Sequence, residues 1–564
     1  MKFLISVLLF STVVFAQNSF PKTYFRSPLD IDLLLAGGFG ELRSNHFHTG
    51  LDFKTQQKEG FNVYASAEGY ISRIKISTSG YGKAIYIAHP NGFTTVYAHL
   101  QKGNPIIEKY IKTNQYKEQS FEVELFPKPS DLPVKKGEII ALSGNSGSSG
   151  GAHLHFEFRD SKTENILNPL LFGFDALIKD TKLPIVTSLF VYPVGENAVV
   201  NESTKPISLG LSLQKDGSYI SQKVMACDKI GFGIGAYDIF DFSYSKIGLY
   251  NVTTFLNGRS SFSYQFDSFS FDEKRFINAL IDYPRFMNTG SKVQKLFMKN
   301  AYPLSLIQTD LKNGLIEVKP NITNLYKIEI SDFNRNKMTI HIPIAYSNKI
   351  SKTAINTSNS GILLKSKIEN LYKKGSATIY VPPNAFYEDF YLNFVITGDT
   401  IAFHDESVAL QKNINISIED STINDADKSK TFVALLDGKK QVYNSTKIKG
   451  NEFSISTKNL GKYMLASDKT APSIKALNIL EGKLINLKSS LQLNIDDSIS
   501  GIKSYNGFIN EKWVLFEYDF KTKKIVHQFD DLLLQDGRND LRVVVSDNVG
   551  NSTTFATYFL HKKQ

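Results

Sequence analysis

Cysteine is almost absent from this chain. Cys227 is the only one among 564 residues, so the fold cannot rest on a disulfide framework. No cysteine lies where the expected export signal ends, which argues against a bacterial lipoprotein. Tryptophan also occurs once, whereas tyrosine occurs 27 times and phenylalanine 41 times. Together with recurrent strand-like alternation, this aromatic content favours β-rich domains.

Long apolar runs are lacking as well. The apolar stretch within residues 1–16 follows Lys2 and ends in a small-residue pattern at Ala16, which is typical of a cleaved secretory signal. It is shorter than the roughly 20 residues that span a bilayer, although an uncleaved anchor is the alternative. We find no other candidate and expect no transmembrane segment. We therefore expect secretion across the inner membrane of a bacterium, into the periplasm or to the cell surface.

Lysine and arginine do not gather into a block with interleaved aromatic residues. An exported protein without such a block is a poor partner for nucleic acid, so we expect no nucleic-acid binding. The formal net charge of +10 suits polyanionic surroundings such as cell-wall polymers or anionic lipid surfaces. Simple solubility explains the same charge equally well.

The chain is long enough for three or four domains, and we expect a mainly β fold. After the signal, residues 17–179 form a first domain of antiparallel sheets that holds every candidate site residue, with an insertion or long loop at residues 101–133. Two β-rich domains are expected at 180–346 and 347–466. A last domain at 467–564 is expected to be an Ig-like β-sandwich.

Alternation of apolar and polar residues predicts four early strands, separated by glycine-rich turns. These strands are expected at residues 61–65, 69–76, 84–89 and 94–100. Much later in the chain, acidic residues followed by apolar residues predict a helix that begins at Asp272.

An Asp-to-Asn turn after a strand occurs twice in the later domains. Residues 332–336 read DFNRN and residues 547–551 read DNVGN, a weak internal echo of sandwich domains. Asp496, Asp497 and Asp547 suggest a calcium site. Aspartate at strand ends is more often turn chemistry, which is the interpretation we favour.

The most informative stretch is residues 144–159, GNSGSSGGAHLHFEFR. It begins as a turn-rich loop and ends with strand-like alternation. Alternation places His153 and His155 on one face of a strand, roughly 7 Å apart, and the leucine and phenylalanine residues between them on the buried face. Two adjacent imidazoles above an apolar sheet predict a zinc site. The loop before them is expected either to make tight turns or to let a peptide approach bare backbone, or both.

Two earlier stretches contain similar side chains. His48 and Asp52 are four residues apart, so they share a side of either a strand or a helix, and both are good zinc ligands. This pair alone is a weak signal. His99 follows an apolar strand and, taken alone, reads as a structural histidine. His46 also precedes the pair, and we expect it to have a supporting role.

Taken together, three motifs resemble the lysostaphin/LytM-type zinc metallopeptidases, which cut peptide bridges of bacterial peptidoglycan. The motifs are HTGLD at 48–52, VYAHL at 96–100 and SGNSGSSGGAHLHFEFR at 143–159. They stand in the order found in that family, and the resemblance covers residues 35–172. It implies a groove built from antiparallel sheets, the duplicated-hybrid-motif fold.

The resemblance also implies a role for each candidate residue. His48, Asp52 and His155 are the zinc ligands that it implies. His99 and His153 are the catalytic histidines, which orient a water, accept its proton or stabilise the oxyanion. Which histidine does which stays open.

The implied substrate is the peptide cross-link of peptidoglycan. The chain has no recognisable wall-binding SH3-like module and its composition looks Gram-negative, so we expect D,D-endopeptidase activity on direct cross-links rather than cleavage of pentaglycine bridges. Three alternatives stay open: a non-catalytic LytM-type activator of another wall hydrolase, a metallopeptidase that acts on non-wall peptides, and a structural or adhesive surface protein. The later domains are expected to bind the wall, hold a regulatory partner or cover the groove.

Overall fold

The computed structural model describes residues 20–562, apart from residues 44, 350–360, 486–489 and 530–533. The expected secretory signal at residues 1–16 lies outside the described residues. The described chain is mainly β, as predicted. Among its helices, none combines the length and the apolar character needed to cross a bilayer.

The first part of the chain folds into one large sheet and one three-stranded sheet. The main path of the large sheet runs, in spatial order, through β1 (Leu35–Gly37), β4 (Leu51–Lys54), β13 (His153–Asp160), β8 (Phe93–Ala98), β7 (Lys83–Ala88), β6 (Gly69–Ile76) and β10 (Val123–Leu125). The small sheet is β5 (Asn62–Tyr64), β12 (Ile139–Ser143) and β9 (Leu100–Gly103). Short additional elements are β2 (Leu42–Arg43), β3 (His46–Phe47), β11 (Pro133–Val134), β14 (Ile166–Leu167), η1 (Pro169–Phe172) and η2 (Phe174–Leu177). The four predicted early strands are confirmed as β5 to β8.

The register of β13 brings distant motifs together. β13 pairs antiparallel with β4 on one side, so that His155 lies opposite Asp52. On its other side it pairs with β8, and His155 lies opposite Ala98, the residue before His99. The same strand therefore receives the first motif on one edge and the second on the other.

The expectation of a long loop after residue 100 was wrong in its first half, because residues 105–118 form the helix α1 (Pro105–Glu118). The side chain of Asn104 caps the helix by accepting from two backbone N–H groups, and Pro105 follows at the position where proline is best tolerated. Ile107 and Ile111, four residues apart, supply its buried face. Charged residues on the exposed face hid this helical spacing.

The second part of the chain is a larger antiparallel assembly that also contains parallel pairs. Its main path is β17 (Ile207–Leu209), β15 (Ile185–Pro193), β20 (Val224–Tyr237), β28 (Lys337–Tyr346), β27 (Asn324–Ser331), β21 (Asn251–Leu256), β22 (Arg259–Gln265) and β25 (Ile307–Thr309). Shorter strands are β16 (Val199–Val200), β18 (Leu211–Leu213), β19 (Tyr219–Ser221), β23 (Ser268–Phe269), β24 (Gln294–Lys295) and β26 (Ile316–Val318). The predicted helix at Asp272 is observed as η3 (Phe271–Phe276) continuing into α2 (Ile277–Leu280), and α3 (Tyr283–Thr289) follows.

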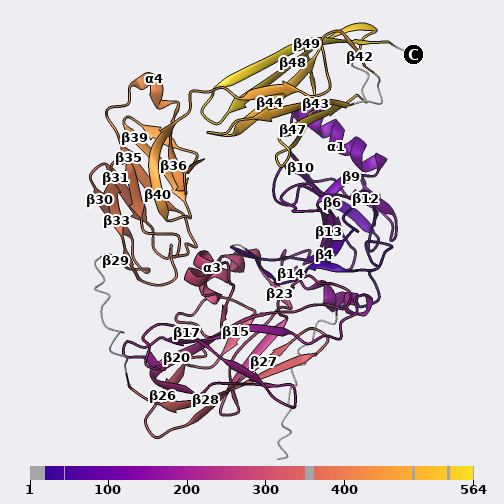
Figure 1. Cartoon of the computed structure of the whole chain (residues 1–564). Helices are drawn as coiled ribbons and strands as arrows, with labels where there is room; N and C mark the ends of the chain where they lie inside the picture. The colour runs from indigo at the N-terminus through magenta and orange to yellow at the C-terminus, as the bar shows by residue number, and fades with distance from the viewer. Residues whose placement is uncertain (1–19, 44, 350–360, 486–489, 530–533, 563–564) are drawn as a thin grey trace, which may run out of the picture.

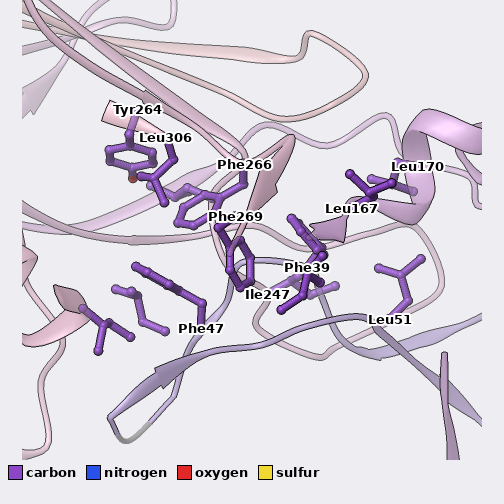
Figure 2. Close-up of a cluster of buried hydrophobic side chains, with 14 of the residues drawn as sticks. Phe39, Phe47, Leu51, Leu167, Leu170, Ile247, Tyr264, Phe266, Phe269 and Leu306 are labelled. Carbon is purple, nitrogen blue, oxygen red and sulfur yellow. The ribbon is translucent and has the colours of Figure 1, made fainter. Parts of the chain in front are cut away.

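These first two parts share one hydrophobic core. Strand β14 of the first part pairs with β23 of the second. Around this pairing, Phe39 and Phe47 pack against Phe269 with tilted rings, and Phe47 also contacts Phe266. Figure 2 shows these rings facing one another between the two parts, with Ile247 beside Phe39. The predicted boundary at residue 179 therefore separates two sets of strands that bury a common surface.

The third part is built from one two-stranded and two five-stranded sheets, and the last part from a four-stranded and a five-stranded sheet. In the third part, the two-stranded sheet is β29 (Ile362–Leu364) with β32 (Phe390–Leu392), and the helix is α4 (Asp425–Lys428). One five-stranded sheet is β30 (Asn370–Lys374), β31 (Ala377–Val381), β35 (Ile414–Glu419), β39 (Glu452–Thr457) and β38 (Lys447–Lys449). The other is β33 (Phe394–Thr397), β34 (Thr400–Phe403), β40 (Gly461–Ser467), β36 (Thr431–Asp437) and β37 (Lys440–Tyr443). The last part contains β41 (Ser473–Ala476), β43 (Ser490–Asp496), β47 (Lys524–Gln528) and β46 (Glu517–Asp519), and β42 (Lys483–Ile485), β49 (Ser552–His561), β48 (Gly537–Asp547), β44 (Ile502–Ile509) and β45 (Lys512–Val514). Each has its own core.

The four parts are arranged as a ring, and the last part returns to the first (Figure 1). There the ring of Tyr116 on α1 meets Trp513 edge to face, with centroids 5.3 Å apart. Lys83 pairs with Glu517 at 2.7 Å. The amino group of Lys521 donates to the backbone oxygens of Asn145 and, at 3.3 Å, of Ser149. The last part therefore contacts the glycine-rich loop that leads into β13.

Candidate active site

Three side chains of the first part converge at the edge between β4 and β13. His48 precedes β4, Asp52 lies on β4 and His155 lies on β13, and all three are buried. Asp52 Oδ1 is 3.1 Å from His48 Nε2 and 2.8 Å from His155 Nδ1. The two ring nitrogens are 3.0 Å apart. One atom from each residue thus surrounds a single point, as a cation site requires.

The outer hydrogen bonds set the tautomers of both imidazoles. His48 Nδ1 is 2.7 Å from the backbone oxygen of Gly38 and therefore carries its proton. His155 Nε2 is 2.8 Å from a carboxylate oxygen of Glu157 and carries its proton too. When both rings are neutral, each directs a lone pair at Asp52 Oδ1, so that three acceptors face one another. Two imidazole nitrogens and one carboxylate are a donor set that fits zinc.

The inward nitrogen of His155 is Nδ1, the ring atom nearest to Asp52. The reason is Glu157, two residues further along the strand, which takes Nε2. Strand alternation predicts the face on which a histidine lies but not which of its ring nitrogens points inward.

Electrostatics around these three residues favour a positive group between them. Burial acts to raise the pKa of Asp52, but His48 and hydrogen bonds from the other imidazoles hold it well below its ordinary value. Burial likewise acts to lower the pKa of His155, but hydrogen bonds to Asp52 and Glu157 raise it to about 9. The second carboxylate oxygen of Asp52 accepts from Arg43 at 2.5 Å. This leaves Oδ1 as the oxygen that faces both imidazoles.

The other two predicted histidines lie beside this cluster. The ring centroid of His99 is 4.8 Å from that of His153 and 5.9 Å from that of His155. His99 Nδ1 is 2.9 Å from the backbone oxygen of Ser146, and burial, with the neighbouring imidazoles, lowers its pKa to about 3. Its φ of 58° lies in the left-handed region, which a non-glycine residue adopts at a cost.

His153 is held from the opposite side. Its Nδ1 lies 2.8 Å from the backbone oxygen of Gly151 and 3.1 Å from Ser149 Oγ. Its Nε2 is 3.5 Å from Asp52 Oδ1. The structure therefore brings together all five residues that the sequence singled out. His46, in contrast, is exposed on β3.

A buried acidic group behind His155 was missed by the sequence reasoning. The carboxylate of Glu157 is fully buried and accepts from His155 Nε2, from Arg159 Nε at 2.8 Å, and from the hydroxyls of Thr49 and Tyr81. Although burial acts to raise its pKa, Arg159 and these hydrogen bonds hold it far below the ordinary value. Strand alternation was the signal that could have found it, because residue 157 shares a face with residues 153 and 155.

The glycine-rich loop makes the expected tight turns in its first half and has open space beside its second half. A Cβ at Gly147 would lie 2.3 Å from the backbone nitrogen of Gly82, so these two turns pack backbone against backbone. Gly150 and Gly151, next to His153, would meet nothing within 4 Å. The first half of the loop is thus close-packed, and the second half presents bare backbone to the site.

Comparison with known proteins identifies the class. Residues 46–116 match the family model "Peptidase family M23", and residues 362–468 match "Zu5-like domain". An uncharacterized metalloprotease of Haemophilus influenzae is 36% identical over 111 residues, which is 20% of this chain and 18% of that protein. The DD-carboxypeptidase/endopeptidase Mpg of Neisseria meningitidis is 34% identical over 118 residues, 21% of each chain. The match thus spans about a fifth of the length of these curated relatives.

Solved structures that are similar to this chain include the catalytic domain of the antimicrobial peptidase lysostaphin from Staphylococcus simulans. It is 25% identical, covers 25% of this chain and 92% of that one, and has a TM-score of 0.19. The amino-terminal part of the chain is similar to peptidases of family M23, of the lysostaphin/LytM type. The family match includes His48, Asp52 and His99 and ends before β13.

Proposed function

We propose that this protein is a secreted zinc metalloendopeptidase that hydrolyses peptide cross-links of bacterial peptidoglycan, with D,D-endopeptidase activity on direct cross-links. The observation that carries the proposal is the convergence of His48 Nε2, Asp52 Oδ1 and His155 Nδ1 at 2.8–3.1 Å, with both outer ring nitrogens already engaged. Relatives named DD-carboxypeptidase/endopeptidase and peptidoglycan DD-endopeptidase support the substrate class.

Zinc is the group that these three residues would hold. When bound, it supplies a Lewis acid that makes water a competent nucleophile near neutral pH. Three protein ligands leave the open position that a catalytic site needs. Glu157 and the backbone of Gly38 keep the two imidazoles in the required tautomers.

His99 and His153 share one hydrogen-bonding state. Each has its Nδ1 beside a backbone oxygen, so each neutral ring offers an Nε2 lone pair. A lone pair accepts a hydrogen bond from a water and can take its proton. The protonated ring can then donate to the leaving amine. Both histidines are therefore proposed as acid–base residues that orient the attacking water.

The test uses the full mature chain, because a truncation near Gly173 would expose Phe39 and Phe47, which pack against the second part. We expect purified protein to hold one zinc and to cleave directly cross-linked muropeptide dimers, with loss of activity in chelator. His155→Ala should lose the zinc. His153→Ala should keep it and lose about 10²–10⁴-fold in rate. His404→Ala, in the third part of the chain, should change neither property.

Three outcomes would contradict the proposal in different ways. Zinc-free protein that cleaves nothing but stimulates another wall hydrolase would indicate a non-catalytic activator. Zinc-loaded protein that cleaves unrelated peptides and spares muropeptides would place the substrate outside the wall. Cleavage of pentaglycine bridges but not of direct cross-links would overturn the proposed bond specificity.

A further inference from the structure

A second group of carboxylates lies at the junction between the first and second parts of the chain, away from the peptidase site. Asp180 follows η2, Asp238 follows β20 and Asp332 follows β27. One carboxylate oxygen from each lies within 4.8 Å of the others. The three residues are 8%, 3% and 2% exposed. Nothing in the peptidase reaction uses them.

These negative charges are not neutralised by the protein. In the described part of the chain, no ion pair joins any of the three to a lysine or arginine. Asp180 Oδ2 is buried and has no hydrogen-bond partner. Burial and the neighbouring carboxylates raise the pKa of Asp238 to about 8. A buried, unpaired carboxylate is costly, and a metal ion is one of the few groups that removes the cost.

The last part of the chain contains an equivalent carboxylate corner, formed by Asp468, Asp497 and Asp547, which differs from the first corner in one respect. Asn336 Nδ2 donates to Asp332 at 2.6 Å and contacts the backbone oxygen of Asp180, and Asn551 Nδ2 makes the same pair of bonds to Asp547 and Asp468. Two runs of paired strands are also repeated: β15–β20 corresponds to β41–β43, and β21–β27–β28 corresponds to β44–β48–β49. The two runs share one sheet in the second part, where β20 pairs with β28, and lie in separate sheets in the last part.

The corner in the last part is satisfied by N–H groups. Asp497 accepts three backbone N–H groups, at 2.7–3.2 Å. Both carboxylate oxygens of Asp468 accept backbone N–H groups as well. Asp496, the remaining member of the set that suggested calcium, pairs with Lys523 at 2.7 Å. Turn chemistry accounts for this corner, whereas at the first corner an oxygen of Asp180 has no partner.

We propose that Asp180, Asp238 and Asp332 bind a calcium ion at the junction between the peptidase part and the second part. Calcium is bound by oxygen ligands at about 2.3–2.6 Å, so two ligands of one ion are at most about 4.6–5.2 Å apart, and the three oxygens, all within 4.8 Å of one another, fit within that limit. An all-carboxylate set favours a hard cation over zinc. Magnesium is less suitable because it demands octahedral geometry at shorter distances and retains its waters.

The ion would brace a loop that supports the peptidase site. The backbones of Asp238 and Ile247 exchange two hydrogen bonds, each 2.9 Å long. Between them, Ser243 Oγ donates to the backbone oxygen of Leu35 on β1 at 2.8 Å. Ile247 packs beside Phe39 (Figure 2) and so closely against Gly38 that a Cβ there would meet it at 1.9 Å. Gly38 is the residue whose backbone oxygen orients His48.

The test is a calcium titration of the full mature chain already loaded with one equivalent of zinc. We expect one site with a Kd on the order of 10⁻⁴ M, as in other extracellular calcium modules. Saturating calcium should raise the Tm of the transition that includes the first two parts by roughly 5 °C. Asp238→Asn should weaken calcium binding at least roughly tenfold and remove the Tm shift.

The Asp238→Asn variant should also give a result that a simple loss of packing would not give. Without calcium, Asp238→Asn should be more stable than the parent chain, because it removes a carboxyl group whose burial beside two other carboxylates is unfavourable. Asp497→Asn, the matched change at the other corner, should retain calcium binding and the shift. Absence of calcium binding at about 10 mM would overturn the proposal, as would an equal Tm shift with magnesium or a loss of the shift in Asp497→Asn alone.

Discussion

Single side chains around β13 show how a buried charge network orients a histidine that is proposed to bind metal. Glu157 is fully buried, yet it costs little because Arg159, two hydroxyls and His155 use its oxygens. The network leaves one proton on His155 Nε2 and turns the other nitrogen toward Asp52. Groups that orient a ligand in this way contribute to metal affinity without touching the ion.

Glu157→Gln should lower zinc affinity by about 10–100-fold while keeping the shape of the side chain. The amide accepts less strongly from His155 Nε2 and leaves Arg159 without its buried counter-charge. Zinc affinity can be measured by competition with a chromogenic chelator, with circular dichroism to verify folding. Glu164→Gln is the matched control, because Glu164 contacts Arg159 at 3.3 Å from an exposed position. Equal affinity for the two variants would contradict the orienting role.

The glycine-rich loop before β13 is tightly packed at Gly147 and open at Gly150. Gly147 adopts φ of +68° and closes on Gly82, whereas Gly150 faces open space. The same loop carries the backbone oxygen of Ser146 that engages His99. Its conformation therefore decides the position of a proposed catalytic residue.

Gly147→Ala should destabilise the protein by about 1–3 kcal/mol, since it adds strain at a positive φ and a clash with Gly82. It should also lower activity by displacing His99. Gly150→Ala is the matched control within the same loop and should leave the Tm unchanged. Both variants are compared with the parent chain by thermal unfolding and by their rate of muropeptide cleavage. Similar Tm values would show that the loop adapts more freely than its packing indicates.

The turn between β7 and β8 contains a buried histidine unrelated to the site. His89 bonds the backbone oxygen of Glu68 and Thr95 Oγ1, both at 2.8 Å. Burial lowers its pKa below the ordinary value of 6.5, although Glu68 acts in the opposite direction. Above pH 6.5 the folded and unfolded forms are both neutral at this ring. Below it the unfolded chain takes up a proton that the folded chain resists, so stability falls as the pH drops.

His89→Gln should therefore flatten part of the acid dependence of stability. Between pH 7 and pH 5 the Tm of the parent chain should fall further than that of the variant, even if the variant begins lower. Thermal unfolding at pH 7, 6 and 5 gives both curves. Parallel curves would show that His89 is protonated equally in both states.

The ring of four parts joins the peptidase site to the rest of the chain by two kinds of contact. The first and second parts share a continuous aromatic core. The last part contacts the first through the Lys83–Glu517 ion pair, backbone acceptors, one aromatic pair and the partly buried side chains of Tyr505 and Leu515. Surface ion pairs contribute at most about 1 kcal/mol each. The junction with the last part is therefore the one that can open without unfolding.

The double variant Lys521→Ala/Glu517→Gln should release the last part from the rim of the site. We expect a Tm close to that of the parent chain, a larger radius of gyration by small-angle X-ray scattering, and faster cleavage of intact peptidoglycan. The reason is that Lys521 contacts the backbone of Asn145 and Ser149, in the loop that precedes His153. Slower cleavage with the same expansion would instead indicate that the last part helps to position the substrate.

Much of the first part of the fold and of the candidate site could be predicted from local sequence patterns. Alternation predicted β5 to β8, and three motifs singled out His48, Asp52, His99, His153 and His155, which the structure brings together. Such features depend on neighbours a few residues apart, and so a linear sequence displays them. The helix α1 was missed because its apolar face is narrow.

Other features depend on segments far apart in the chain. The inward nitrogen of His155, the burial of Glu157 and the meeting of Asp180, Asp238 and Asp332 all follow from strand register and the packing of two parts. A register shift of one residue would turn His155 away from Asp52. No local pattern encodes that choice, because burying the shared aromatic core selects it among the registers that the sequence allows.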